Sequence, residues 1–218
     1  MSRHITGKEG AAGTQVIANK VNTDQYSQVQ TRPSSGDAPC YDETSVQSVV
    51  ASLRKNEERF ARNLINSIER DQQRQKLVND FNHLMAQGSG TEACLLQELG
   101  LVHTLFNDQL ITSIQRDASR KLLYTKLHES CLPQATDVPP IADCLTLMNS
   151  AYEQDLINSI QRDASRQMLW QALHNLLLAR ARTDAEIDQA LDAVNQLYEK
   201  DLINSLQRDA TRKALSKK

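Results

Sequence analysis

The chain has 218 residues, of which 39% are hydrophobic and 24% are charged, and its formal net charge is -2. A charge so close to neutral creates no overall field that would attract nucleic acid or anionic lipid, so we expect neither as a partner. The sequence has no apolar run of about 18 residues that could span a membrane. Its first 20 residues lack the apolar core of a secretory signal peptide.

Residues 1–44 form a polar leader that holds four of the seven glycines and two of the five prolines. Its few apolar residues follow neither a helical nor a strand period, so it cannot bury enough surface to offset the entropy of ordering it. We therefore predict a flexible leader, and expect that deleting residues 1–44 leaves thermal unfolding unchanged. A second interpretation is an uncleaved export signal for a bacterial secretion system.

A motif of eleven residues occurs four times in the rest of the chain. The copies are LINSIERDQQR from Leu64, LITSIQRDASR from Leu110, LINSIQRDASR from Leu156 and LINSLQRDATR from Leu202, so successive copies start 46 residues apart. A fixed period of this size indicates a tandem structural repeat. The predicted repeat domain covers residues 45–218, divided into 45–90, 91–136, 137–182 and a truncated last repeat at 183–218.

Each repeat is predicted to open with a helix, because one aligned column contains only residues that cap helix N-termini. Their side-chain oxygens accept the unpaired amide protons of a first helical turn. The column consists of Ser45, Thr91, Asp137 and Thr183. Glu186 completes a capping box with Thr183, and Pro139 and Pro140 suit the first turn of the third repeat.

Four apolar columns follow at steps of 7, 4 and 4 residues, which would place them on one helical face. They are Leu53/Leu99/Leu145/Leu191, Phe60/Phe106/Tyr152/Tyr198, Leu64/Leu110/Leu156/Leu202 and Ile68/Ile114/Ile160/Leu206. The aromatic column could be a ligand cage, but its place within the apolar stripe favours a core position repeated four times.

The polar stretch after the last column, Glu69 to Lys76 in the first repeat, permits two architectures. In the first, each repeat is a helical hairpin that turns near Arg70 and Asp71, so that Asp71 and its counterparts cap the second helix. In the second, one helix of nearly 40 residues runs through each repeat and four of them form an antiparallel bundle. The hairpin lacks Gly, Pro or Asn at this turn, whereas the long helix would bury a polar band. We favour an all-α solenoid of hairpins, with the long-helix bundle as the alternative.

The spacing I-x-x-[IL]-x-x-D-x-x-R-x-x-L within each copy is similar to HEAT and armadillo repeats, which often carry Asp and Arg about the turn between their helices. The resemblance covers the core of each repeat and implies an α-solenoid.

The charged columns are the only candidates for a binding site. The arginines are Arg70, Arg74, Arg116, Arg120, Arg162, Arg166, Arg208 and Arg212, and the aspartates are Asp71, Asp117, Asp163 and Asp209. One interpretation is a structural ladder in which each Asp pairs with an Arg of its own or the next repeat. The other is a row of arginines that binds an acidic or phosphorylated ligand. We favour the ladder.

No sequence pattern indicates catalysis, a metal site or a cofactor. Two of the five histidines, His128 and His174, share a column and are expected to face solvent. Cys40, Cys94, Cys131 and Cys144 have no metal-ligand spacing, so we expect reduced thiols and a reducing, cytoplasmic compartment, either in the producing cell or after export into a host cell.

The fourth repeat ends at ALSKK, without a second apolar run. We expect it to leave an apolar patch uncovered and open to self-association, made up of Leu173, Leu176, Leu177 and Leu178.

These features predict a non-catalytic helical-repeat module that binds a protein partner, in the setting of a secreted bacterial effector that acts on a host protein. The alternatives are an enzyme with a site built across repeats from the Arg and Asp columns, and a self-assembling structural protein.

Overall fold

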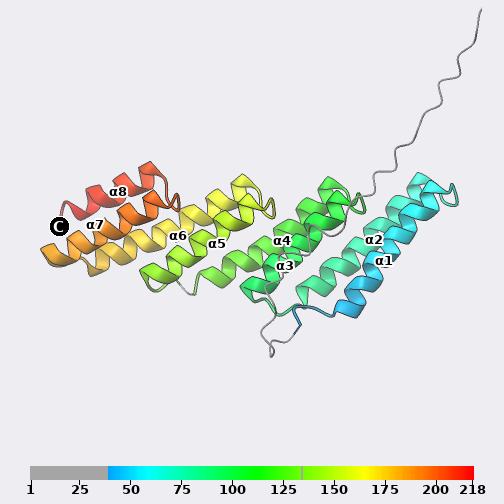
Figure 1. Ribbon diagram of the computed structural model, residues 1–218, viewed down its shortest axis with the longest axis horizontal. Coiled ribbons are helices and arrows are strands. Elements are labelled where there is room, and N and C mark those ends of the chain that lie inside the picture. The colour runs from blue at the N-terminus through cyan, green and yellow to red at the C-terminus, as the bar shows by residue number, and fades with distance from the viewer. Residues whose placement is uncertain (1–38, 134) are drawn as a thin grey trace, which may run out of the picture. The chain divides into compact units, whose positions relative to one another are not determined.

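The computed structural model of the protein describes residues 39–133 and 135–218, and every regular element in these residues is an α-helix (Figure 1). Residues 1–38, which make up most of the predicted leader, lie outside the described part. The helices pair in chain order, each pair packing as one repeat. The pairs are α1 (Glu43–Ala61) with α2 (Ser67–Ala86), α3 (Glu92–Asn107) with α4 (Ser113–Cys131), α5 (Val138–Glu153) with α6 (Ser159–Arg180), and α7 (Asp184–Glu199) with α8 (Ser205–Leu215).

The hairpin architecture is confirmed, but the turn lies earlier than the sequence predicted. The first helix of the first repeat ends at Ala61, and Asn63 adopts a left-handed backbone with φ 55°. The amide of Leu64 then donates to the carbonyl of Arg59, and that of Asn63 donates to the carbonyl of Phe60. This pair of hydrogen bonds is the Schellman motif, which ends a helix and reverses the chain. Gln109, Asp155 and Asp201 have the same conformation in the other repeats.

The N-caps of the second helices are therefore not Asp71, Asp117, Asp163 and Asp209, as predicted. They are Asn66, Thr112, Asn158 and Asn204, and in each case the residue three positions later completes a capping box. The predicted aspartates lie inside the second helices. The turn was missed because it uses Asn, Gln or Asp in the left-handed position, where glycine is the usual signal.

The predicted caps of the first helices are confirmed for Thr91, Asp137 and Thr183, and Thr183 forms the expected capping box with Glu186. Ser45 is not a cap: α1 starts earlier, and the Asp42 side chain accepts the Ser45 amide proton.

The core lies between the two helices of each repeat and continues from one repeat to the next. Leu53, Leu99 and Leu145 of the first predicted column are each 1% exposed, which agrees with the sequence. The Ile68 column was predicted to share this buried face, but all four of its members are exposed because the chain reverses before the column. A single apolar face through all four columns is therefore wrong.

Neighbouring repeats are joined by hydrogen bonds between their second helices. Tyr124 Oη donates to the Gln161 carbonyl (2.9 Å), and one repeat later Trp170 Nε1 donates to the Gln207 carbonyl (3.1 Å). The expectation that the shared histidine column faces solvent is wrong: His128 Nδ1 lies 2.9 Å from Ser165 Oγ, and its counterpart His174 Nδ1 lies 3.0 Å from Thr211 Oγ1. Burial lowers the pKa of both imidazoles and so favours their neutral form, which suits these contacts.

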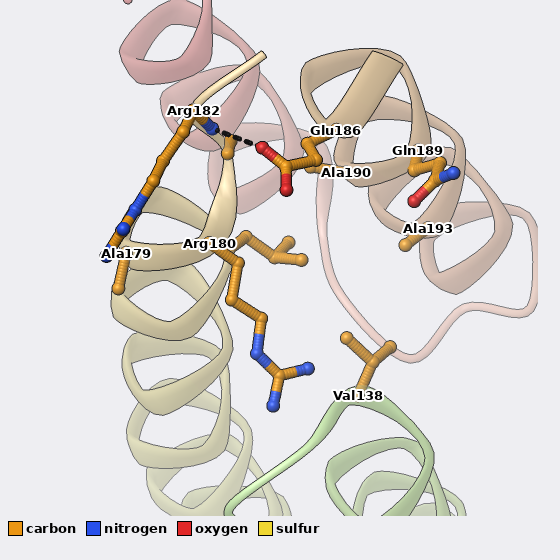
Figure 2. A pocket seen from close by; sticks show the side chains of 10 residues that line it. Val138, Ala179, Arg180, Arg182, Glu186, Gln189, Ala190 and Ala193 are labelled. Carbon is orange, nitrogen blue, oxygen red and sulfur yellow. Dashed lines mark hydrogen bonds between the residues drawn. The ribbon is translucent and has the colours of Figure 1, made fainter.

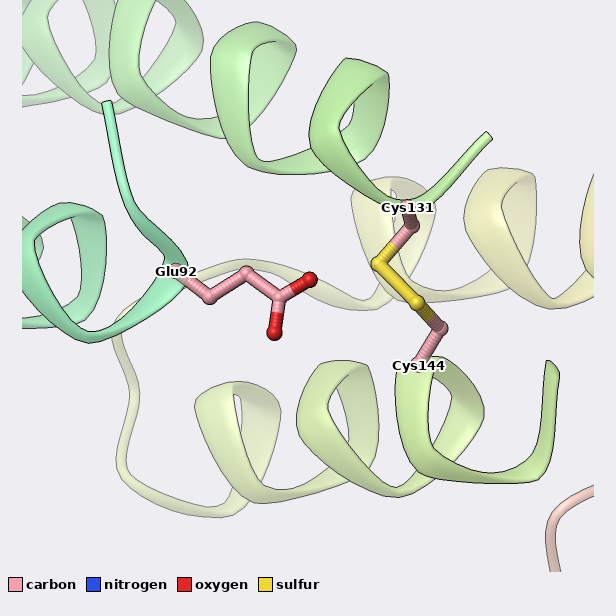
Figure 3. Close-up of side chains that lie close together, drawn as sticks. All are labelled: Glu92, Cys131 and Cys144. Carbon is pink, nitrogen blue, oxygen red and sulfur yellow. A yellow bond between two sulfur atoms is a disulfide. The ribbon is translucent and has the colours of Figure 1, made fainter. Parts of the chain in front are cut away.

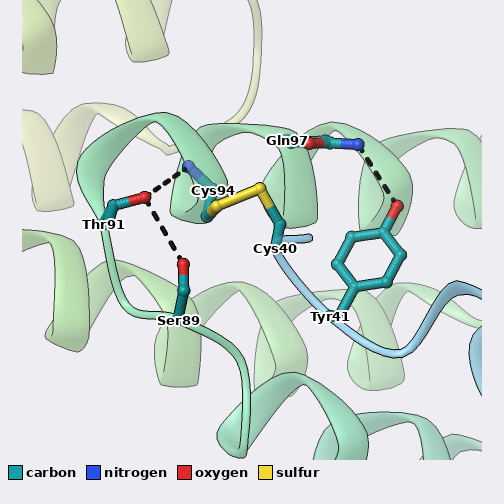
Figure 4. Close-up of a disulfide and its surroundings, with 6 residues drawn as sticks. All are labelled: Cys40, Tyr41, Ser89, Thr91, Cys94 and Gln97. Carbon is teal, nitrogen blue, oxygen red and sulfur yellow. Dashed lines mark hydrogen bonds between the residues drawn. A yellow bond between two sulfur atoms is a disulfide. The ribbon is translucent and has the colours of Figure 1, made fainter. Parts of the chain in front are cut away.

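The four cysteines form two disulfides, which corrects the expectation of reduced thiols. Cys40, just before α1, is bonded to Cys94 of α3 with an S–S distance of 2.02 Å (Figure 4). Beside it, Gln97 Nε2 donates to Tyr41 Oη over 3.4 Å. Residues 39–44 therefore belong to the folded unit and not to the leader. The second disulfide joins Cys131, the last residue of α4, to Cys144 of α5.

The apolar patch expected at the truncated end is largely covered. Leu173 and Leu177 are buried, and Leu176 and Leu178 are partly buried against the core. The short helix α8 closes this end with Leu215, which is fully buried. No helix in the described ranges is both long enough and apolar enough to cross a membrane.

One carboxylate is buried where the first two repeats meet. Glu98 of α3 is 0% exposed, and neither of its oxygens has a hydrogen-bond partner among the described residues. Its Oε1 lies so close to Gly88 that a Cβ there would collide with it. Burial raises the pKa of Glu98 to about 7, opposed by the positive charge of Lys126.

The protein should therefore lose stability as the pH rises from about 4.5 to about 7 and change little above that, because the unfolded chain ionises Glu98 first. At about 1.4 kcal/mol per pH unit, the loss amounts to roughly 3 kcal/mol. Glu98→Gln should remove this dependence and raise the urea midpoint at pH 8. An unchanged pH profile in the variant would show that Glu98 is not the group responsible.

Removal of residues 39–44 should lower the melting temperature, contrary to the expectation for the whole leader. A protein that starts at residue 45 lacks the Cys40 disulfide, worth about 2 to 4 kcal/mol, and the Asp42 cap, worth about 1 kcal/mol. Calorimetry should be compared for chains that start at residues 39 and 45. Cys40→Ser in the longer chain isolates the disulfide, and equal melting temperatures would refute the assignment of residues 39–44 to the fold.

Candidate functional site

The hairpin tips carry the same exposed aliphatic side chain in every repeat. It follows the N-cap of the second helix by two positions, at the end of the hairpin where the chain reverses. The exposed fractions are 67% for Ile68, 80% for Ile114, 79% for Ile160 and 80% for Leu206. In residues 39–218 the four tips follow one edge of the array, the upper edge in Figure 1. We call these four side chains the tip ridge.

Each repeat also carries an arginine that is stacked on an aromatic ring, two residues after its member of the tip ridge. In the first repeat the guanidinium carbon of Arg70 lies 4.1 Å from the centre of the Phe60 ring, and the same distance recurs in the other three repeats. The other pairs are Arg116 on Phe106, Arg162 on Tyr152 and Arg208 on Tyr198. The aromatic column is therefore only partly buried and supports arginines, so it lies at the margin of the core, against which Phe106 packs.

Each of these arginines is also paired with the next residue in the chain. Arg70 Nη2 lies 2.8 Å from Asp71 Oδ1, and the pairs at Asp117, Asp163 and Asp209 have distances of 2.8 to 2.9 Å. The hydrogen bond from Arg70 lowers the pKa of Asp71, and that from Arg208 lowers the pKa of Asp209. Each tip thus presents a neutral, pre-organised unit of aliphatic, arginine, ring and carboxylate groups.

The second arginine column has a different environment, inside the array. Arg120 is 4% exposed, and its Nη2 donates to the Asp155 carbonyl in the turn of the next repeat (2.6 Å). Arg166 Nη2 likewise donates to the Asp201 carbonyl (3.0 Å). Arg74 is also buried and pairs with Glu57 of its own repeat, whereas Arg212, in the last repeat, is exposed.

Seven of the eight predicted binding arginines thus separate into two groups, and the exposed Arg212 belongs to neither. Arg70, Arg116, Arg162 and Arg208 lie at the tips, and Arg74, Arg120 and Arg166 lie within or between repeats. The tip ridge itself was not identified from sequence. The signal was present, because this column precedes the polar stretch, but it was assigned to a buried face.

A hollow of about 520 Å³ lies where the third and fourth repeats meet (Figure 2). Its lining is mostly apolar, with the polar side chains of Arg180, Arg182, Glu186 and Gln189. Glu186 is engaged as a helix cap, since it accepts from the amides of Arg182 and Thr183 (both 2.9 Å). Arg180 is paired with Asp137. This lining offers no nucleophile with an adjacent base.

The two arginine columns should differ in their effect on stability. Arg120→Ala removes a buried hydrogen bond from a charged group and should cost about 2 to 3 kcal/mol. Arg116→Ala removes a half-exposed stack and should cost about 0.5 to 1 kcal/mol. Urea unfolding followed by circular dichroism measures both. Equal losses would contradict the separation of the two columns.

Comparisons of the chain with protein-family models, with curated proteins and with solved structures find no match. The helical-repeat fold therefore rests on the helices and their packing.

Proposed function

We propose that the chain is a non-catalytic helical-repeat module that binds a folded protein partner through the tip ridge. The observation that carries this proposal is the recurrence of a strongly exposed aliphatic side chain at the same position of all four repeats. Residues that recur in a solenoid usually hold neighbouring repeats together. Side chains that are 67% to 80% exposed contribute little to such packing, so another reason for their recurrence is needed.

The form of the ridge favours a folded partner over a flexible peptide. A peptide binds in a groove that encloses its side chains, whereas Ile114, Ile160 and Leu206 project from helix ends. Projecting side chains fit apolar pockets on the other protein, and burying one fully is worth about 1.5 to 3 kcal/mol. A partner with pockets at regular intervals would engage several tips, so that weak contacts add up through avidity.

The charges at the tips disfavour a polyanionic ligand. Each tip arginine is already paired with the adjacent aspartate, so an acidic or phosphorylated ligand would have to displace that carboxylate. The arginine also lies flat on its ring, which fixes its donors in direction. In the proposed complex the tip arginines donate hydrogen bonds to acceptors at the rim of each partner pocket, and the aliphatic side chains supply the buried contact.

The biological setting we propose is that of a bacterial effector that acts on a host protein. It is supported by the polar leader, whose composition resembles that of uncleaved export signals. Enzymatic activity built across the repeats and self-assembly are the competing functions, and the following experiment distinguishes partner binding through the ridge from self-assembly.

A variant with Ser at all four ridge positions should lose its partner while remaining folded. Wild-type and variant protein are used to capture partners from host-cell lysate, and each captured protein is then purified and titrated against both. The matched control carries Ser at Leu122, Leu132 and Met168, which are also exposed apolar residues but do not lie at the tips.

The proposal requires that the purified partner binds the control like the wild type and that affinity falls stepwise with each ridge position removed. A second variant with Ala at Arg70, Arg116, Arg162 and Arg208 should weaken binding less. Equal loss in ridge and control variants would indicate non-specific adhesion. Sedimentation at several concentrations tests for self-assembly. If the mass rises with concentration in the wild type but not in the ridge variant, the ridge binds a second copy of this chain and not another protein.

A further inference from the structure

Three side chains that can ligate metals meet where the second and third repeats join. They are Glu92 at the start of α3, Cys131 at the end of α4 and Cys144 in α5. One carboxylate oxygen and the two sulfur atoms all lie within 4.8 Å of one another. Figure 3 shows the Glu92 carboxylate directed toward the disulfide. Both cysteines are buried, at 0% and 3% exposed.

The equivalent positions at the other two junctions between repeats carry different residue types. A shift of 46 residues forward leads to Val138, Leu177 and Ala190, which are all apolar and line the hollow between the third and fourth repeats.

The corresponding shift backward leads to Val46, Met85 and Glu98, with a single ionisable group. The second junction thus differs from the others at three positions at once. A disulfide accounts for the two cysteines, but it does not need a carboxylate at the position where the first and third repeats have valine.

We propose that Glu92, Cys131 and Cys144 form a zinc-binding site that is available when their disulfide is reduced. A dithiol reductant transfers two electrons and two protons to the disulfide, leaving two thiols and the oxidised, cyclic form of the reductant. Zinc then displaces the two thiol protons and binds both sulfurs as thiolates, together with the carboxylate. The site exchanges a covalent link between the two repeats for a metal link.

The donor set and its spacing select zinc. Two thiolates and one carboxylate suit a borderline-soft cation of tetrahedral preference, with water as the fourth ligand. Ligand distances of about 2.0 to 2.3 Å place the donor atoms about 3.3 to 3.8 Å apart. Side-chain rotation can bring atoms within 4.8 Å to this spacing, and the Cα atoms of the two cysteines are already 5.8 Å apart.

The test uses the full chain, reduced with a phosphine that does not bind zinc, and zinc alone as the probe. The starting protein carries Cys40→Ser and Cys94→Ser, so that only the second cysteine pair remains. We expect one zinc per chain by atomic emission after gel filtration. Cobalt in place of zinc should give the thiolate charge-transfer absorption of a site with two sulfur ligands.

Glu92→Gln should then weaken zinc binding at least tenfold, measured by competition with a chromophoric chelator. Cys131→Ser or Cys144→Ser should abolish stoichiometric binding. The matched control is Asp184→Asn, which changes the carboxylate at the equivalent helix start of the fourth repeat, away from any cysteine.

Circular dichroism of each reduced variant shows whether it is folded, so that a folding defect is distinguished from the loss of a zinc ligand. Glu92→Gln is the decisive variant, because it leaves both thiols in place. The proposal is overturned if the reduced protein takes up no stoichiometric zinc, or if Glu92→Gln binds zinc as tightly as Asp184→Asn does. Either result would leave the disulfide as a purely structural link between the repeats.

Discussion

The chain reversal at the hairpin tips is the constraint on which the rest of the array depends. A single residue with a left-handed backbone ends each first helix, and the N-cap of the second helix follows three residues later. This short turn places the Arg70 column over the Phe60 column and separates the exposed Ile68 column from the core. A turn near Asp71 would have buried the ridge. The candidate binding surface is thus a direct consequence of where the helix stops.

The stacking of repeats depends on polar contacts superimposed on a continuous apolar core. Equivalent positions of the second helices make these contacts in successive repeats. The Tyr124 hydroxyl donates to a backbone carbonyl of the next repeat, and the His128 imidazole forms a hydrogen bond with a hydroxyl there. Hydrogen bonds are directional, so they fix the register between hairpins, while apolar packing alone would tolerate slippage. The two disulfides add covalent links at the first two junctions.

The two arginine columns show how one residue type serves two purposes in a repeat. Arg120 is buried and tied to the turn of the following repeat, so it belongs to the stacking contacts. Arg116 lies one helical turn earlier, stacked on Phe106 and paired with Asp117 at the edge of the array. The second column thus makes contacts between repeats, as a structural ladder would, whereas ligand binding by the tip arginines stays a prediction. The aspartates pair with the tip arginines of their own repeat.

The sequence by itself determined the period, the helical class, three of the four first-helix caps and the Leu53 column of the core. These features depend on local chemistry: capping oxygens, apolar spacing and a motif repeated without insertion. Tertiary structure alone decided the turn, because Asn63, Gln109 and Asp155 are not the glycines that usually mark a left-handed helix end. It also decided the exposure of Ile68, the support of Arg70 by Phe60 and the pairing of the cysteines, since each depends on which segments the reversed chain brings together.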